Sequence, residues 1–232
     1  MRKTLFLGLL AIGLFGISPA EQKKQPAKQP GKQAAKKEVG VKPEEVRQVL
    51  LSGIEKDSRF LWKTEQDESQ RICSQYPSME DMPPQAIQKV IELENKNIVY
   101  PQWGIAWGDW QEGRKLVQNS RGGRFASYGF SDKPTDKGGN CYACHLIEKG
   151  VPGGTMGPSL TGYGKRYEIT KENMNTPEGL EKLKTVYKIV YNSWHAYPCS
   201  AMPRFGYHGA LSPEDVMNIA TYLLHPESPV NK

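Results

Sequence analysis

Residues 141–145 read Cys-Tyr-Ala-Cys-His, a C-x-x-C-H stretch that occurs once in the 232-residue chain and decides its fold. Two thiols at this spacing can each form a thioether bond with a vinyl group of a haem, and the histidine can then bind the iron. The alternatives are a redox-active pair of cysteines, which expects a strand–helix–strand context, and half of a zinc site, which needs further ligands nearby. The surrounding sequence shows neither. We therefore predict one covalent haem c on Cys141 and Cys144, with His145 as an axial iron ligand.

The first twenty residues have the organisation of a secretory signal peptide. Arg2 and Lys3 form a positive start, residues 5–17 are apolar, and residues 18–20 are small enough for a cleavage site. We therefore expect export to the periplasm with cleavage after Ala20. The alternative is an uncleaved anchor, although the apolar run is short for a membrane span. No cysteine follows the cleavage position, which argues against a lipid-modified terminus.

The positive net charge of +6 is concentrated near the amino terminus. Seven lysines and two glutamates give residues 21–42 a charge of +5, and residues 43–232 together carry about one negative charge. The basic segment is rich in Lys, Gln, Pro and Ala and has too few apolar residues to fold alone, so we predict a disordered linker. A weak electrostatic contact with an acidic partner or a membrane is the alternative. The near-neutral remainder argues against nucleic acid as a partner.

The chain after the linker divides into a helical extension, residues 43–100, and a haem domain, residues 101–232. In the extension, apolar residues recur at helical spacing in residues 43–54, and a second helix is predicted to begin at Pro83 or Pro84. The stretch between these helices is irregular. The role of the extension is left open by its sequence.

Three helices are predicted in the haem domain: one before the C-x-x-C-H motif, one after it and one near the end of the chain. The first is capped by Asp109, the second begins at Thr176-Pro177, and the third is capped by Ser212. This order predicts an all-α fold, a class I cytochrome c domain with an N-terminal helical extension.

The second axial ligand of the iron must come from another part of the chain. Met202 lies in the loop 200–206 before the last helix, where class I cytochromes c, which this chain resembles, carry a distal methionine. A thioether ligand favours ferrous iron and raises the reduction potential. Met202 competes with His195 and His208, which flank it, and with Met156, which is expected to line the proximal pocket instead.

Several separated segments also resemble one particular family of cytochromes. Residues 139–145 read GNCYACH, residues 153–164 read GGTMGPSLTGYG, residues 201–206 read AMPRFG and residues 224–231 read LHPESPVN. Together they are similar to SoxX, the monohaem subunit of SoxAX complexes of bacterial thiosulfate oxidation. The proximal loops of class I cytochromes c further imply that the Pro158 carbonyl accepts the free N–H of the proximal imidazole.

The resemblance implies a heterodimer with a SoxA-like cytochrome, in a complex of the L-cysteine S-thiosulfotransferase type. In that scheme a SoxYZ-like carrier protein receives the thiosulfate on a cysteine, and this chain passes electrons to a small acceptor cytochrome. We expect no catalytic residue of its own, since Cys199 is the one candidate nucleophile and nothing near it in sequence lowers its pKa. The alternatives are a free-standing periplasmic electron shuttle unrelated to sulfur, and a haem sensor or peroxidase with an exchangeable iron ligand.

The two cysteines outside the motif, Cys73 and Cys199, form an even pair in an exported chain, which favours a disulfide. Such a bond would fasten the extension to the loop that holds Met202. Two buried free thiols, or a bridge from one of them to a SoxA-like partner, are the alternatives. Sequence alone does not give the distance between the two Cα atoms that decides among them.

Overall fold

The computed structural model describes residues 42–52, 65–120 and 137–232, and within these ranges every regular element is helical. This agrees with the predicted all-α fold. The predicted signal peptide, residues 1–20, and the predicted linker, except for Lys42, lie outside the described residues. The α-helices are α1 (Pro43–Ser52), α2 (Glu68–Cys73), α3 (Pro84–Lys96), α4 (Trp110–Gln118), α5 (Tyr163–Arg166), α6 (Pro177–Tyr191) and α7 (Pro213–Leu224). Single 3₁₀ turns are η2 (Met79–Asp81), η4 (Cys141–Ala143), η5 (Ser193–His195) and η6 (Pro229–Asn231).

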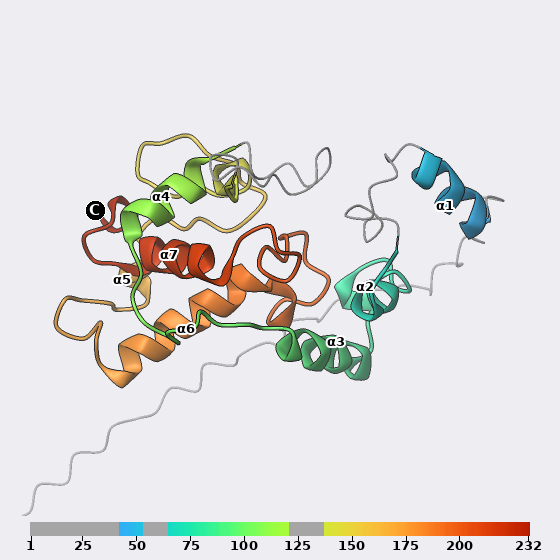
Figure 1. Cartoon of the computed structure of the whole chain (residues 1–232), viewed down its shortest axis with the longest axis horizontal. Coiled ribbons are helices and arrows are strands. Elements are labelled where there is room, and N and C mark those ends of the chain that lie inside the picture. The colour runs from blue at the N-terminus through green and yellow to red at the C-terminus, as the bar shows by residue number, and fades with distance from the viewer. Residues whose placement is uncertain (1–41, 53–64, 121–136) are drawn as a thin grey trace, which may run out of the picture. The chain divides into compact units, whose positions relative to one another are not determined.

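Helix α7 is the centre of the haem domain and lies between α4 and α6 (Figure 1). As predicted, Ser212 caps it: its hydroxyl accepts from the Asp215 N–H, and the Asp215 carboxylate accepts from the Ser212 N–H. Ile219, Leu223 and Leu224 are buried, as their helical spacing predicts. Burying apolar side chains of this size contributes about 1.5–3 kcal/mol each, so α7 dominates the core.

Helices α4 and α7 approach each other closely. A Cβ on Gly113 of α4 would overlap the Asn218 carbonyl and lie 2.9 Å from Cβ of Tyr222, so only glycine fits there. The predicted cap, Asp109, accepts hydrogen bonds from the first amides of α4, and its own N–H donates to the Asn218 side chain at 2.8 Å. The first and last helices of the domain are thereby locked together.

A buried carboxylate, Glu148, joins α4 and α7 from the segment that follows the C-x-x-C-H motif. Arg114 of α4 donates to its two oxygens at 2.7 and 2.9 Å, and the Tyr222 hydroxyl donates at 2.6 Å. Burial alone would raise the pKa of Glu148, but the hydrogen bonds from Arg114 and Tyr222 outweigh it and the pKa is lowered. The pair is therefore ionised and fully hydrogen-bonded at neutral pH.

The extension differs from its prediction in two ways. Helix α1 forms as predicted, but Val46 and Val49 are 45% and 71% exposed, so these two valines do not enter the core. Helix α2 lies in the stretch predicted to be irregular, where six residues are too few to show helical periodicity. Helix α3 begins at Pro84, one of the two predicted positions, and buries Val90 and Glu94 one turn apart. Among the described helices, none combines the length and the apolar character that crossing a bilayer requires.

Candidate haem centre

The C-x-x-C-H motif folds into one tight turn. Asn140, in the left-handed region at φ 48°, redirects the chain into η4, and the N–H groups of Cys144 and His145 then donate to the Cys141 carbonyl at 3.1 and 2.9 Å. Residues three apart in a 3₁₀ turn lie on the same side. The turn thus brings the Cys141 and Cys144 side chains to one side, with His145 directly after them.

Neither motif cysteine is in a disulfide, and the environment of Cys141 does not suit a redox-active cysteine pair. Burial raises the pKa of the Cys141 thiol to about 12, and the neighbouring Cys144 adds to the shift. Redox-active and zinc-binding cysteines need a lowered pKa, because the thiolate is the reactive form. Within the described residues, no group of three or more His, Cys, Asp or Glu side chains could hold a metal ion. The raised pKa of Cys141 and the lack of further ligands among the described residues favour thioether attachment over either alternative.

A second segment, residues 153–160, runs along the motif and completes the proximal side. The N–H groups of Gly154, Gly157 and Leu160 donate to carbonyls of Tyr142, Cys144 and Leu146 at 2.8, 2.8 and 2.7 Å respectively. These bonds join backbone to backbone, so they depend on glycine at the closest approaches and hardly on side-chain chemistry. They hold the turn that carries the histidine.

The His145 ring is fixed in orientation by this segment. Its Nδ1 lies 2.7 Å from the Pro158 carbonyl oxygen, the contact that the resemblance to class I cytochromes c implies. A carbonyl can only accept, so Nδ1 carries the hydrogen and Nε2 has the free lone pair that a metal needs. A Cβ on Gly157 would lie within 2.6 Å of Nδ1, so the ring is pressed against the backbone of that glycine.

The predicted distal ligand, Met202, is half-buried against the same hydrophobic core as Cys141 and Leu160. Its carbonyl accepts a hydrogen bond from the Ser193 hydroxyl at 2.9 Å. The two sides of the site also meet at Gly139, where a Cβ would lie 2.9 Å from Sγ of Cys141 and 3.7 Å from the ring of Phe205, three residues beyond Met202. The distal loop therefore borders the motif.

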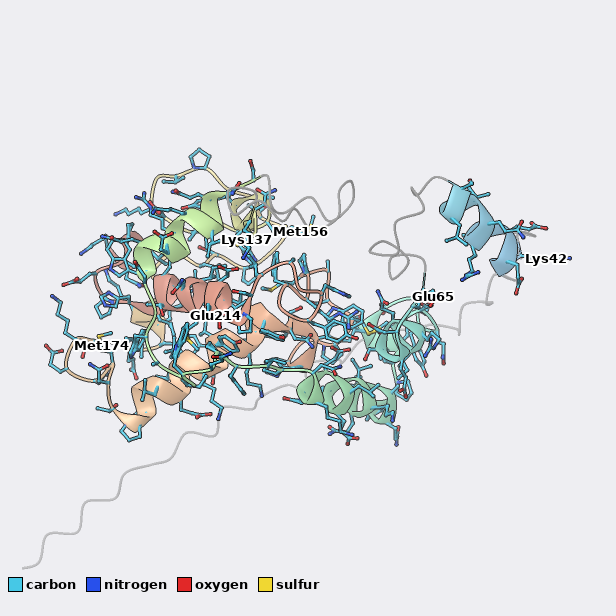
Figure 2. All side chains as sticks on the ribbon, in the orientation of Figure 1. Lys42, Glu65, Lys137, Met156, Met174 and Glu214 are labelled. Atoms are coloured by element: carbon cyan, nitrogen blue, oxygen red, sulfur yellow. A yellow bond between two sulfur atoms is a disulfide. The ribbon has the colours of Figure 1, made fainter. Side chains whose placement is uncertain are left out.

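The other candidate ligands, Met156, His195 and His208, differ from Met202 in exposure or in hydrogen bonding. Met156 was expected to line the proximal pocket, but it is 78% exposed, with its sulfur 4.0 Å from Sγ of Cys144 (Figure 2). His195 has a buried Nε2 with no hydrogen-bond partner among the described residues, so it remains a candidate. Burial, followed by the charge of Lys188, lowers the pKa of His195 to about 4. Burial and then Arg204 lower the pKa of His208 to about 4, so both rings are neutral at pH 7.

An ionic cluster that the sequence did not reveal holds the distal loop. The Arg204 guanidinium donates to Glu94 of α3 at 2.9 Å and to Asp67, the cap of α2, at 2.6 Å. It is stacked between the rings of Trp194 and Tyr207, 4.3 and 4.4 Å from their centroids. Arg204 and Glu94 are 3% and 1% exposed, so this charge pair is buried between extension and loop. The one signal in the sequence was a glutamate on the apolar face of α3.

Cys73 and Cys199 are joined by a disulfide in the structure, with Cα atoms 5.6 Å apart. The bond connects the end of α2 to the distal loop, three residues before Met202. Cys199 has φ 61°, a left-handed conformation that residues other than glycine rarely adopt. A cavity of about 360 Å³ is lined by both cysteines together with Met82 and Trp194. The pairing in the oxidised protein stays a prediction for mass spectrometry to test.

The donor set fits a covalent c-type haem: two thiols on one side of a turn, an imidazole with a free Nε2, and a thioether on the facing loop. Comparison with known proteins agrees. A sequence model of the cytochrome c family matches residues 111–226, which include all four of these side chains. A relative named an uncharacterized lipoprotein, from Aquifex aeolicus (strain VF5), is 36% identical over 231 residues, covering 99% of this chain and 98% of its own length. This chain belongs to the cytochrome c family.

Proposed function

We propose that the protein carries a single covalent haem c, with His145 and Met202 as the axial ligands, and works as a one-electron carrier. The observation that carries the proposal is the 2.7 Å contact between Nδ1 of His145 and the Pro158 carbonyl. This contact leaves Nε2 as the ligand atom and aligns the ring. The facing loop, with Met202 against the same core as Cys141, supports the methionine as the opposite ligand.

The bound haem supplies an Fe(III)/Fe(II) couple that takes up and releases one electron. The protein's own residues set how easily this occurs. Thioether bonds from Cys141 and Cys144 keep the group attached, the Pro158 carbonyl increases the basicity of the His145 imidazole, and the neutral sulfur of Met202 favours the reduced state.

We further propose that the protein acts as the SoxX-like subunit of a SoxAX complex. The order of the segments around residues 139–145, 153–164 and 201–206 supports this role. In this role the chain docks with a SoxA-like cytochrome, which couples thiosulfate to a cysteine of a SoxYZ-like carrier, and it delivers the electrons to a small acceptor cytochrome. A free-standing shuttle would use the same haem chemistry without the partner.

The proposed location is the periplasm, with a signal peptide removed after Ala20. Attachment of haem to a C-x-x-C-H motif fits an exported chain. The Aquifex relative is named a lipoprotein, so a membrane-anchored form is the competing possibility. Residues 1–72 contain no cysteine, the residue on which bacterial lipoproteins carry their lipid. Amino-terminal sequencing of the exported protein tests the proposal: a chain that retains residues 1–20 would contradict cleavage.

Affinity purification from periplasm, followed by haem staining of denaturing gels, tests the partner. A second haem-stained band that co-purifies in equal amount, and is identified as SoxA-like, is the expected result. Its absence, together with normal reduction by a small cytochrome, favours the free-standing shuttle.

The distal ligand has its own test. Met202→Ala should remove the long-wavelength sulfur-to-iron charge-transfer band of the ferric protein, lower the potential and open the iron to carbon monoxide. An unchanged spectrum in Met202→Ala, with a changed one in His195→Ala or His208→Ala, would assign the ligand to a histidine. A wild-type ferrous protein that already binds carbon monoxide would favour a sensor or peroxidase.

A further inference from the structure

We infer that Arg204, held by Glu94 and Asp67 of the extension, is a positioning residue that keeps the Met202 sulfur on the iron. The inference rests on the proposed ligation by Met202 and adds to it a role for residues 65–96. These residues lie outside the part of the chain that matches the cytochrome c family. The extension would then hold the loop that carries the iron ligand in position.

The connection between Arg204 and Met202 is short and stiff. One residue, Pro203, separates them, and its ring fixes φ near the value for an extended or turn conformation. A residue before proline is itself restricted to extended backbone, so Met202 has little freedom of its own. The carbonyl of Met202 is also held by Ser193 at 2.9 Å. A displacement of Arg204 must therefore move the backbone that carries the thioether.

Arg204 itself has almost no freedom to move. Its guanidinium donates to carboxylates on two helices of the extension and stacks on the rings of Trp194 and Tyr207. Asn192, at the end of α6, donates to the second oxygen of Glu94 at 2.6 Å, which fixes that carboxylate. Removing the charge of either carboxylate leaves the buried guanidinium only partly neutralised, which destabilises the closed position of the loop.

The inference is tested in the full-length, haem-loaded protein with two variants that change charge and keep shape. Glu94→Gln removes the buried charge, and Asp67→Asn removes the second one while asparagine still caps α2. The probe is imidazole, which replaces a methionine on ferric iron only when the loop opens. Losing the charge on either of these hydrogen-bonded carboxylates should raise the replacement rate about tenfold. The charge-transfer band should weaken and the potential should fall in the same variants.

The matched control is Glu148→Gln. It removes the charge of a buried carboxylate that accepts two hydrogen bonds from Arg114, whose side chain is partly exposed, and that makes no hydrogen bond to the distal loop within the described residues. This variant should lose comparable stability while imidazole replaces methionine at the wild-type rate. Equal acceleration in Glu148→Gln, or wild-type rates in both Glu94→Gln and Asp67→Asn, would overturn the inference. Met202→Ala separates the two proposals. If this variant keeps the charge-transfer band, Met202 is not the ligand and the inference about Arg204 fails with it. If the band is lost but Glu94→Gln and Asp67→Asn show no acceleration, Met202 stays the ligand and only the inference about Arg204 fails.

Discussion

The two sides of the candidate haem centre are held by different means. On the proximal side, His145 and Pro158 are 13 residues apart and the supporting bonds join backbone groups. On the distal side, Arg204 pairs with residues 110 and 137 positions away, and the disulfide spans 126 positions. The proximal side is therefore a local structure. The distal side depends on the extension being in place, so it is the side that should open first.

The largest effect is expected from breaking the proximal side. Changing Cys141 and Cys144 together to serine should abolish covalent haem, because neither thioether can form. Without the haem to fill the space between motif and distal loop, the protein should be poorly folded. Haem staining after denaturing electrophoresis and circular dichroism measure the two outcomes. A double variant that keeps covalently bound haem would refute the attachment site.

The next largest effect should come from the disulfide on the distal side. A cross-link closing a loop of 126 residues restricts the unfolded chain, for which the chain-entropy estimate is on the order of 4–5 kcal/mol. Cys73→Ser combined with Cys199→Ser should lower the unfolding free energy by up to that amount, measured in urea. It should also speed the replacement of Met202 by imidazole, because the loop loses its covalent fastening.

The same bond can be tested without mutation. Cys73 and Cys199 line the 360 Å³ cavity, so a small reductant can reach the disulfide. Treating the holoprotein with a small thiol should weaken the charge-transfer band and leave the haem attached. Mass spectrometry of non-reduced peptides gives the decisive check: alkylation of both cysteines without prior reduction would reject the bond.

A smaller effect is expected from a pair of glycine variants, one on each side. Gly157→Ala forces a methyl group against the His145 ring, and Gly206→Ala forces one into the Tyr191 ring below the distal loop. Overpacking of this kind costs about 1–3 kcal/mol. The unfolding free energy should fall in both, but only Gly206→Ala should accelerate imidazole binding. Equal acceleration in both would mean that the two sides open together.

The sequence was sufficient to predict the proximal side and the final helix, because the residues that determine each of them lie close together in the chain. The C-x-x-C-H motif and the Ser212 cap each act over a few residues, so a local pattern predicts them, and the resemblance to class I cytochromes c supplied the Pro158 contact. The cysteine pair was expected from counting cysteines in an exported chain, although its distance could not be known. Helix α1 was predicted correctly, yet its exposed Val46 shows that periodicity does not establish burial.

The ionic cluster could not be predicted, for a physical reason. Arg204 and its partners lie on separate elements, and nothing in the sequence states which of the many charged residues will meet in the folded chain. Helix α2, which supplies Asp67, is six residues long and is defined by its cap more than by any repeat. Tertiary contacts of this kind appear only once the extension and the loop are placed together.

The last expected effect, which appears only at acid pH, is a dependence of distal stability on pH. His195 and His208, which flank Met202, have pKa values lowered from 6.5 to about 4. A histidine whose pKa is lower in the folded state binds protons preferentially when unfolded. The unfolding free energy should therefore be constant above pH 6.5, fall as the pH decreases toward 4, and level off below that as far as these groups are concerned.

Urea unfolding at pH 7.5 and pH 5 measures this dependence, with up to about 2 kcal/mol expected from each histidine. His195→Gln should flatten the profile by its share. Compared at equal concentrations of neutral imidazole, replacement of Met202 should be faster at pH 5 than at pH 7.5 in the wild type, and this acceleration should be smaller in His195→Gln. His225 is the matched control. Burial lowers its pKa too, but it packs against Trp107 and Trp110 and not against the distal loop. His225→Gln should also flatten the stability profile, but it should leave the pH dependence of imidazole replacement unchanged. If His225→Gln removed that dependence, low pH would destabilise the whole domain. The distal side would then not open independently of the rest of the protein.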